Sequence, residues 1–366
     1  MSNTNLWYTR CPVPTAFSLA IRLGWLDQEF AADGISITSL LQSSDRNVRE
    51  SHFSHTQANS FRHGGNAPPI WARSVGSDVK LIGLSWTDAP QVLLTLPGSG
   101  IKSVADLKGR RLALPRRTLD SIDFARSGTL QSYETALATA GLTLKDVELV
   151  EIVVDRGYLD DSGSTSKDGT LFNAFQNRSF QREEIAAFLQ GKVDVISSNG
   201  PRAVDFQALL GAQVIYDAAT NPNRLAWVNN SYPYTFTVSG KLLEEQPELV
   251  TRLLVKTLEA AEWAKSHHSD AVRIVALELG VAEEFVERSF GPNLSQQFDV
   301  NFSPENVAAL RLRKEFLLKH GFLGGDFDID QWIVTGPLEE AKRIVAAHRK
   351  QTATSKPKAQ ELAEAL

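Results

Sequence analysis

Helical and strand-like patterns alternate along the first two thirds of this chain. In three segments, apolar residues recur at helical spacing, a glycine follows, and an apolar run comes next: "GWLDQEFAADGISITSLL", "SYETALATAGL" and "REEIAAFLQGKVDVISSNGP". A glycine directly after a helical stretch is typical of a helix C-terminus, and a short apolar run is typical of a buried strand. The alternation predicts a mainly parallel sheet with helices on its faces.

Beyond about residue 240 the pattern becomes continuously helical. The segments "PELVTRLLVKTLEAAEWAKSHHSDAVRIVALELG" and "SPENVAALRLRKEFLLKHGFL" repeat apolar residues at the spacing of amphipathic helices. Earlier in the chain, Ser103 is suited to cap a helix with Asp106 in its first turn, and Gly109 to end it. The polar segment 157–172 predicts a loop, and residues 346–366 predict a loosely ordered tail.

This order of elements resembles the two-lobed, periplasmic-binding-protein-like (type II) fold, in which crossing strands join two α/β lobes. The segment "QVLLTLPGSGIKSVADLKGRRLALP" is similar to the first crossing, and "YTFTVSGKLLEEQPELVTRLLVKTLEAAEWAK" to the return. We therefore predict an α/β fold with a mixed sheet flanked by helices in each lobe and a cleft between the lobes. Lobe one would comprise residues 1–96 and 228–345, lobe two residues 97–227. The fold alone does not define a function.

Composition excludes several classes of partner. The 366 residues suffice for two domains of ordinary size. The net charge of −5 provides no basic field for nucleic acid or an anionic membrane. The opening "MSNTNLWYTRCPVP" has neither the basic start nor the apolar run of a secretory signal, so we expect a cytoplasmic protein. No stretch approaches the roughly 20 apolar residues of a membrane span.

Cys11 is the one cysteine of the chain, so no internal disulfide can form. A lipid-anchored cysteine would follow an apolar run, whereas Cys11 follows Tyr8, Thr9 and Arg10. A lone cysteine is most often a small buried apolar residue. Here, however, the segment "CPVPTAFSLAIRLG" predicts a helix start directly after the thiol, and the end of a first strand faces the cleft. Cys11 is therefore a candidate nucleophile, with His52, at the end of the second strand, as the partner base.

A second candidate region is "RHGGNAPP", residues 62–69. Asn66 and the two prolines after it predict a helix start, where free N–H groups and the helix dipole favour an anion. Gly64 and Gly65 allow the backbone to approach a ligand closely, and Arg62 can grip two oxygens of a carboxylate, sulfinate or phosphate. We interpret the segment as an oxyanion cradle; the alternative is a turn with a surface arginine.

Two further groups of residues have simpler interpretations. His52, His55 and His63 would form a zinc site of loose spacing with no interleaved carboxylate, so we predict no metal. The segment "PRR" (115–117) follows a predicted strand of lobe two and either adds positive charge to the cleft or is solvated.

The segments "CPVPTA", "HFSHTQANSFRHGG" and "DQW" together resemble the 2′-hydroxybiphenyl-2-sulfinate desulfinase family, the aromatic sulfinate desulfinases of dibenzothiophene desulfurization. By that resemblance the catalytic cysteine corresponds to Cys11, the neighbouring histidine to His52, the sulfinate-gripping arginine to Arg62, and a backbone N–H donor to Gly65. Two features depart from the family pattern. Histidines stand at positions 55 and 63, where aromatic residues are expected, and residues 115–130 look shorter than in the family and lack an expected tryptophan. The resemblance therefore does not define which aromatic ring system the protein accepts.

The resemblance implies a cofactor-free enzyme, expected to be a monomer, that hydrolyses the aryl C–S bond of a small aromatic sulfinate to an arene and sulfite. Either a Cys11 thiolate attacks sulfur, or the Cys11 thiol protonates the ring carbon. The sequence leaves both routes open, and His52 would tune the thiol in each.

Two other functions fit the same fold. One is a solute-binding protein for sulfonate-type or nitrate-type anions, which would have no use for a thiol in the cleft. The other is a pyrimidine synthase of thiamine biosynthesis, which needs a cysteine-rich iron segment or a substrate-supplying histidine. A chain with one cysteine disfavours the iron-dependent form.

Overall fold

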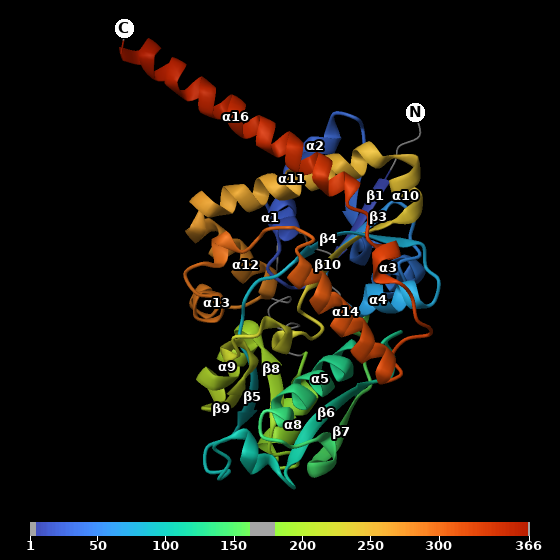
Figure 1. The fold of residues 1–366 in the computed structure, drawn as a ribbon, viewed down its shortest axis with the longest axis vertical. Helices are drawn as coiled ribbons and strands as arrows, with labels where there is room; N and C mark the ends of the chain where they lie inside the picture. Colours follow the sequence, from blue (N-terminus) through green and yellow to red (C-terminus); the bar gives the residue numbers. More distant parts are fainter. Residues whose placement is uncertain (1–4, 162–179, 365–366) are drawn as a thin grey trace.

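The structure is a computed structural model that describes residues 5–161 and 180–364 (Figure 1). It confirms the predicted two-lobed α/β fold, with a mixed sheet in lobe one and two smaller sheets in lobe two. Most of the predicted loop at 157–172 lies outside the described residues. Among the described residues, no helix combines the length and the apolar composition required to cross a bilayer.

Lobe one is built on a five-stranded sheet in the order β2-β1-β3-β10-β4. β1 is parallel to both of its neighbours, whereas β10 is antiparallel to β3 and β4. The parallel strands therefore end at the same edge of the sheet, which brings the segments after β1 and β3 together. The strands are β1 (Asn5–Arg10), β2 (Ser36–Ser39), β3 (Ser60–Gly64), β4 (Val79–Ser85) and β10 (Tyr234–Ser239).

Lobe two contains a three-stranded sheet, β8-β5-β9, and a parallel pair, β6-β7. An isolated bridge between Leu112 and Val195 connects the two sheets. Because β5 pairs with β8 and β9, the chain changes lobe before residue 91, one strand earlier than the predicted boundary at residue 96. The strands are β5 (Gln91–Thr95), β6 (Arg111–Arg117), β7 (Glu148–Val154), β8 (Ile196–Asn199) and β9 (Gln213–Asp217).

Helices cover both lobes, and α11 packs against α1 and α16 over the lobe-one sheet (Figure 1). The helices are α1 (Ala16–Arg22), α2 (Trp25–Ala31), α3 (Arg46–Ser54), α4 (Ala67–Ser74), α5 (Phe124–Ala138), α6 (Tyr158–Asp161), α8 (Arg182–Leu189), α9 (Gly200–Leu210), α10 (Gly240–Glu245), α11 (Pro247–Ser266), α12 (His268–Leu279), α13 (Glu283–Phe290), α14 (Pro304–Lys319), α15 (Ile329–Trp332) and α16 (Gly336–Glu364).

Two local predictions need adjustment. The Asp106 carboxylate accepts the Ser103 N–H at 2.9 Å, as expected for the capped start, but the element is a single 3₁₀ turn (Val104–Leu107). Residues 346–364, which we expected to form a loose tail, continue α16 as a helix that projects from lobe one (Figure 1).

A buried arginine of α14 connects the lobes. Arg313 is fully buried, and its guanidinium donates to Ser127 Oγ of α5 at 2.7 Å and to Asn66 Oδ1 at 3.1 Å. Because Ser127 belongs to lobe two and Asn66 to lobe one, this side chain fixes the two lobes to each other beside the cleft. Removing one partner of such a buried charged group is strongly destabilising.

Candidate active site

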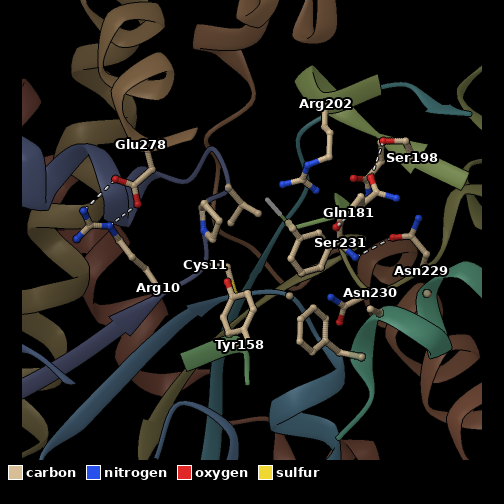
Figure 2. Close-up of a pocket in the computed structure, with 18 of the residues that line it drawn as sticks. Arg10, Cys11, Tyr158, Gln181, Ser198, Arg202, Asn229, Asn230, Ser231 and Glu278 are labelled. Atoms are coloured by element: carbon tan, nitrogen blue, oxygen red, sulfur yellow. Dashed lines mark hydrogen bonds and ion pairs between the residues drawn. The ribbon is translucent and has the colours of Figure 1, made fainter. Parts of the chain in front are cut away.

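A cavity of about 320 Å³ lies between the lobes (Figure 2). We call its two sides the lobe-one wall and the lobe-two wall. The lobe-one wall includes Cys11, His52 and Gly65. The lobe-two wall includes Phe124, Tyr158, Phe180, Gln181, Glu184, Ser198 and Arg202.

Cys11 directly follows β1 and lines the cavity, partly exposed. We predicted that Cys11 lies near a helix N-terminus. This prediction is wrong, because α1 begins only at Ala16 and is capped by Thr15. Gly64 lies against Cys11 instead of the cavity. A Cβ atom at residue 64 would lie 2.6 Å from the Cys11 sulfur, so the absence of a side chain there gives the cysteine its position.

Arg62 is the positive group beside the sulfur. Its Nη2 donates to Cys11 Sγ at 3.2 Å, and its Nη1 donates to the Gly65 carbonyl at 2.7 Å. The side chain is 2% exposed and is not part of the cavity lining, so the direct grip of Arg62 on a ligand stays a prediction. Burial lowers the pKa of Arg62, while Cys11 and Tyr158 raise it. A guanidinium at this distance stabilises negative charge on sulfur.

His52 lines the cavity from α3 and does not follow a strand as we had expected. Its Nδ1 shares a hydrogen bond of 2.7 Å with Thr9 Oγ1, which fixes the ring orientation from β1. Among the described residues, no hydrogen bond joins His52 to Cys11. Burial lowers the pKa of His52 well below its usual value, and the charges of Arg62 and His55 lower it further. The ring is therefore neutral at pH 7.

The predicted anion site at the start of α4 is closed by Asn230. The Ala67 N–H donates to Asn230 Oδ1 at 3.1 Å, and the Asn66 N–H donates to the Asn230 carbonyl at 2.9 Å. Asn66 does not cap the helix, because its side-chain amide donates to the Asn229 carbonyl at 2.7 Å. The prolines in the first turn have no N–H. The helix start is therefore occupied by protein, and Gly65 is the part of the predicted cradle that lines the cavity.

The other two histidines are core residues with separate partners. His55 Nδ1 donates to the Phe53 carbonyl at 2.9 Å, and His63 Nε2 lies 2.9 Å from Ser85 Oγ. The His63 ring also stacks on Phe236, with ring centroids 4.4 Å apart. Within residues 5–161 and 180–364, no cluster of three or more His, Cys, Asp or Glu side chains is arranged to hold a metal ion.

The cavity also contains residues that sequence reasoning missed. Tyr158 lies 5.5 Å from the His52 ring, centroid to centroid, and Figure 2 shows its hydroxyl directed toward Cys11. Burial raises the pKa of Tyr158, and Cys11 adds to the rise, so the phenol remains a hydrogen-bond donor. Arg202 extends its guanidinium into the cavity from α9 (Figure 2). Neither residue belongs to a motif that would have identified it.

The segment "PRR" divides between two environments. Pro115 lines the cavity, and the exposed Arg116 pairs with Glu151 at 2.8 Å. Arg117 is buried against Asp120 and lies 5.6 Å from the centre of the Phe180 ring. The positive charge of Arg117 therefore lies against an aromatic ring of the lobe-two wall.

Comparisons with known proteins show what this chain is similar to. A family model described as NMT1/THI5 like matches residues 15–157. A 2′-hydroxybiphenyl-2-sulfinate desulfinase from Rhodococcus erythropolis is 28% identical over 351 residues, which cover 89% of this chain and 90% of the relative. The predicted resemblance to these desulfinases is confirmed.

Solved structures give the same result. The desulfurization enzyme DSZB matches with a TM-score of 0.73 and 24% identity, covering 93% of this chain and 99% of that chain. A cysteine-to-serine variant of DSZB, solved in complex with biphenyl-2-sulfinic acid, matches with the same TM-score and coverage and 25% identity. The periplasmic aliphatic sulphonate binding protein SsuA from Escherichia coli matches at a TM-score of 0.64 and 18% identity, covering 91% and 93% of the two chains, which establishes the shared fold alone.

Proposed function

We propose that this chain, which is similar over 89% of its length to a 2′-hydroxybiphenyl-2-sulfinate desulfinase, is itself an aromatic sulfinate desulfinase. It hydrolyses the aryl C–S bond of a substrate such as 2′-hydroxybiphenyl-2-sulfinate and releases the arene and sulfite. The observation that carries the proposal is the 3.2 Å contact between Arg62 and the sulfur of Cys11 at the wall of a cavity large enough for an aromatic ligand.

The lobe-one wall has the groups that the reaction needs. Cys11 supplies the sulfur atom, Arg62 stabilises negative charge on it, and the neutral His52 ring lines the same cavity as a group that can relay a proton. Gly65, whose carbonyl holds Arg62, presents its backbone to the cavity beside Cys11. The Tyr158 hydroxyl adds a donor from the opposite side, where it can bond a sulfinate oxygen.

The reaction balances with substrate and water alone. The sulfinate ArSO₂⁻ and H₂O give ArH and HSO₃⁻. In the first route His52 takes the proton of the Cys11 thiol and the thiolate bonds to sulfur. The aryl carbon leaves with its electron pair and receives that proton from His52, and water cleaves the resulting S–S bond to give HSO₃⁻ and the Cys11 thiol. In the second route the Cys11 thiol protonates the ring carbon, and water adds to the SO₂ that departs. The addition of water to SO₂ gives HSO₃⁻ and releases one proton, which His52 passes back to the Cys11 thiolate.

Sulfite release from 2′-hydroxybiphenyl-2-sulfinate tests the proposal directly. Purified protein should form sulfite and 2-hydroxybiphenyl in equal amounts over many turnovers. Because Cys11 is the one cysteine in the chain, mass spectrometry of a quenched single turnover distinguishes the routes without ambiguity. A protein adduct on Cys11 that decays with the rate of sulfite formation supports the first route. Full turnover without such an adduct supports the second.

The fold shared with sulfonate-binding proteins favours one alternative, a protein that binds an anion without converting it. In that case the sulfinate would bind stoichiometrically and be recovered intact. The Arg62–Cys11 contact argues against this alternative, because a thiol is a poor ligand for a sulfonate anion.

A further inference from the structure

Several polar side chains of the lobe-two wall are held by hydrogen bonds within the protein. Gln181 Nε2 donates to the Ser197 carbonyl at 2.8 Å, and Ser198 Oγ donates to Gln181 Oε1 at 2.9 Å (Figure 2). Ser132 Oγ donates to the Gly128 carbonyl of its own helix at 3.1 Å. These contacts build a polar surface whose groups are positioned before a ligand arrives.

Glu184 differs from these neighbours. It lies one turn beyond Gln181 on α8, lines the same wall and is 4% exposed. Its Oε2 atom has no hydrogen-bond partner in the structure. A buried polar atom without a partner costs roughly 1–3 kcal/mol, so such atoms are rare unless a ligand completes them. A ligand group that donates a hydrogen bond would complete this oxygen.

The charges around Glu184 restrict that group. Burial raises the pKa of Glu184 to about 7, its own backbone N–H lowers it, Glu183 raises it, and Arg117 and Arg202 lower it. The two nearby guanidinium groups disfavour a cationic ligand such as an ammonium. A neutral hydroxyl can donate to a carboxyl group in either protonation state. The donor that fits is therefore a hydroxyl.

The buried phenol of Tyr133, whose pKa is affected by Glu184, does not donate a hydrogen bond to Glu184. The Tyr133 hydroxyl, whose pKa Glu184 helps to raise, donates instead to the Ala113 carbonyl at 2.7 Å. Glu184 Oε2 therefore has no protein partner, in a buried side chain that belongs to the cavity lining.

The position of Glu184 indicates which part of a substrate it meets. A sulfinate bound at Cys11 lies on the lobe-one wall, and the rings of Phe124, Tyr158 and Phe180 line the opposite side. An aromatic substrate held between them directs its second ring toward the lobe-two wall, where Glu184 lies.

We propose that Glu184 accepts a hydrogen bond from a hydroxyl group on the second ring of the substrate, and that this contact selects hydroxylated biaryl sulfinates. The inference rests on the proposed function for the sulfinate end of the molecule. It concerns a residue that takes no part in cleavage of the C–S bond.

The test compares biphenyl-2-sulfinate with its 2′-, 3′- and 4′-hydroxy derivatives in the wild type and in Glu184→Leu. In the wild type at least one hydroxylated substrate should exceed the parent in kcat/KM by roughly tenfold, the effect of one hydrogen bond. In Glu184→Leu this advantage should vanish, while kcat/KM for the parent changes less than about threefold, because its ring makes no such bond. An equal advantage in both proteins would overturn the inference.

Two variants control for folding and charge. Glu183→Gln removes the same charge on the same turn of α8, but Glu183 pairs with Arg156 at 2.8 Å, so selectivity should persist. Glu184→Gln keeps an acceptor of the same shape and should retain part of the selectivity. Selectivity lost equally in Glu183→Gln would contradict a direct contact.

Binding separates this inference from the proposed function. If none of the four sulfinates yields sulfite, the proposed function fails. Calorimetric binding of the same four compounds to Cys11→Ser, with and without Glu184→Leu, then decides the role of Glu184. A preference for a hydroxylated compound that Glu184→Leu abolishes supports the inference, and identical affinities for all four compounds contradict it.

Discussion

The two walls of the cavity are built in different ways. On the lobe-one wall, Cys11, Arg62 and Gly65 form one connected unit: Arg62 donates both to the Cys11 sulfur and to the Gly65 carbonyl. On the lobe-two wall, an unpartnered carboxyl oxygen of Glu184 lies among aromatic rings and side chains held by one another. The comparison suggests that the first wall performs the chemistry and the second selects the substrate. Changes on the first wall should therefore lower the rate for every substrate, and changes on the second should alter the preference among substrates.

The largest effect should come from Cys11→Ser. An alcohol is a much weaker nucleophile and a much weaker acid than a thiol, so sulfite release should fall by roughly 10³-fold or more. The partly exposed position should tolerate the smaller oxygen atom, and thermal unfolding should change little. The measurement is single-turnover sulfite release beside calorimetric binding of the sulfinate. Turnover within tenfold of wild type would remove Cys11 from the mechanism.

A matched pair of arginine variants separates the walls. Arg62→Lys keeps the charge but cannot reach both Cys11 and the Gly65 carbonyl, so kcat should fall by on the order of 100-fold for all substrates. Arg202→Lys makes the same replacement of a guanidinium by an ammonium group on the lobe-two wall. It should change kcat/KM by less than about tenfold and unequally among substrates. Similar losses in both variants, independent of substrate, would remove the distinction between the walls.

A pair of glycine variants tests how closely the lobe-one wall is packed. In Gly64→Ala the new Cβ would lie 2.6 Å from the Cys11 sulfur, so Cys11 must shift and the rate should fall by roughly tenfold or more. In Gly128→Ala, on the lobe-two wall, the nearest atom would be Asn230 Cβ at 3.5 Å, an ordinary contact. This helical position should tolerate alanine with a gain in stability of about 0.5–1 kcal/mol. Steady-state kinetics and urea unfolding of the two variants provide the measurement.

The last effect concerns stability against acid and leaves the chemistry at Cys11 aside. Burial lowers the pKa of His55 and of His63 to about 3, and that of His52 well below its usual value. The unfolded chain therefore binds protons below pH 6.5 that the folded chain does not. Stability should be highest above that pH and should fall as the pH decreases from 6.5 toward 3, by about 1.4 kcal/mol per pH unit for each histidine.

His63→Phe should remove one of these three contributions. Urea unfolding at pH 7.5 and pH 5 should show a smaller loss of stability in this variant than in the wild type, by about 2 kcal/mol. His267→Ala, at an exposed position, serves as the control for removal of a histidine that is not buried. An unchanged loss in His63→Phe would mean that His63 already carries a proton in the folded protein.

The sequence was sufficient for the parts of the fold that depend on local pattern. The alternation of helix and strand, the two lobes and the position of Cys11 after β1 follow from periodicity and turn residues. The assignment of β5 to lobe two could not be predicted in this way, because that strand pairs with β8 and β9, more than 100 residues later. Pairing between such distant segments depends on tertiary packing and leaves little trace in a single strand.

Some residues of the site could be predicted from the sequence, and others could not. The spacing of His52 and Arg62 and their resemblance to a family identified Arg62, which the structure brings to the Cys11 sulfur, and His52, which lines the same cavity as Cys11. The closure of the α4 start by Asn230 was not foreseeable, since the contact spans 163 residues. Glu184 was also missed, because an acidic residue in the first turn of a helix is most often solvated. Its burial becomes evident only when α8 is packed against the rest of lobe two.

Titration of the single thiol tests most directly whether Cys11 acts on the sulfinate in this cavity. Protein alkylated with iodoacetamide to increasing extents, as measured by mass spectrometry, is assayed for sulfite release. The rate should fall in proportion to the fraction of Cys11 modified, and biphenyl-2-sulfinate should slow the alkylation. Undiminished sulfite release from fully alkylated protein would contradict the account.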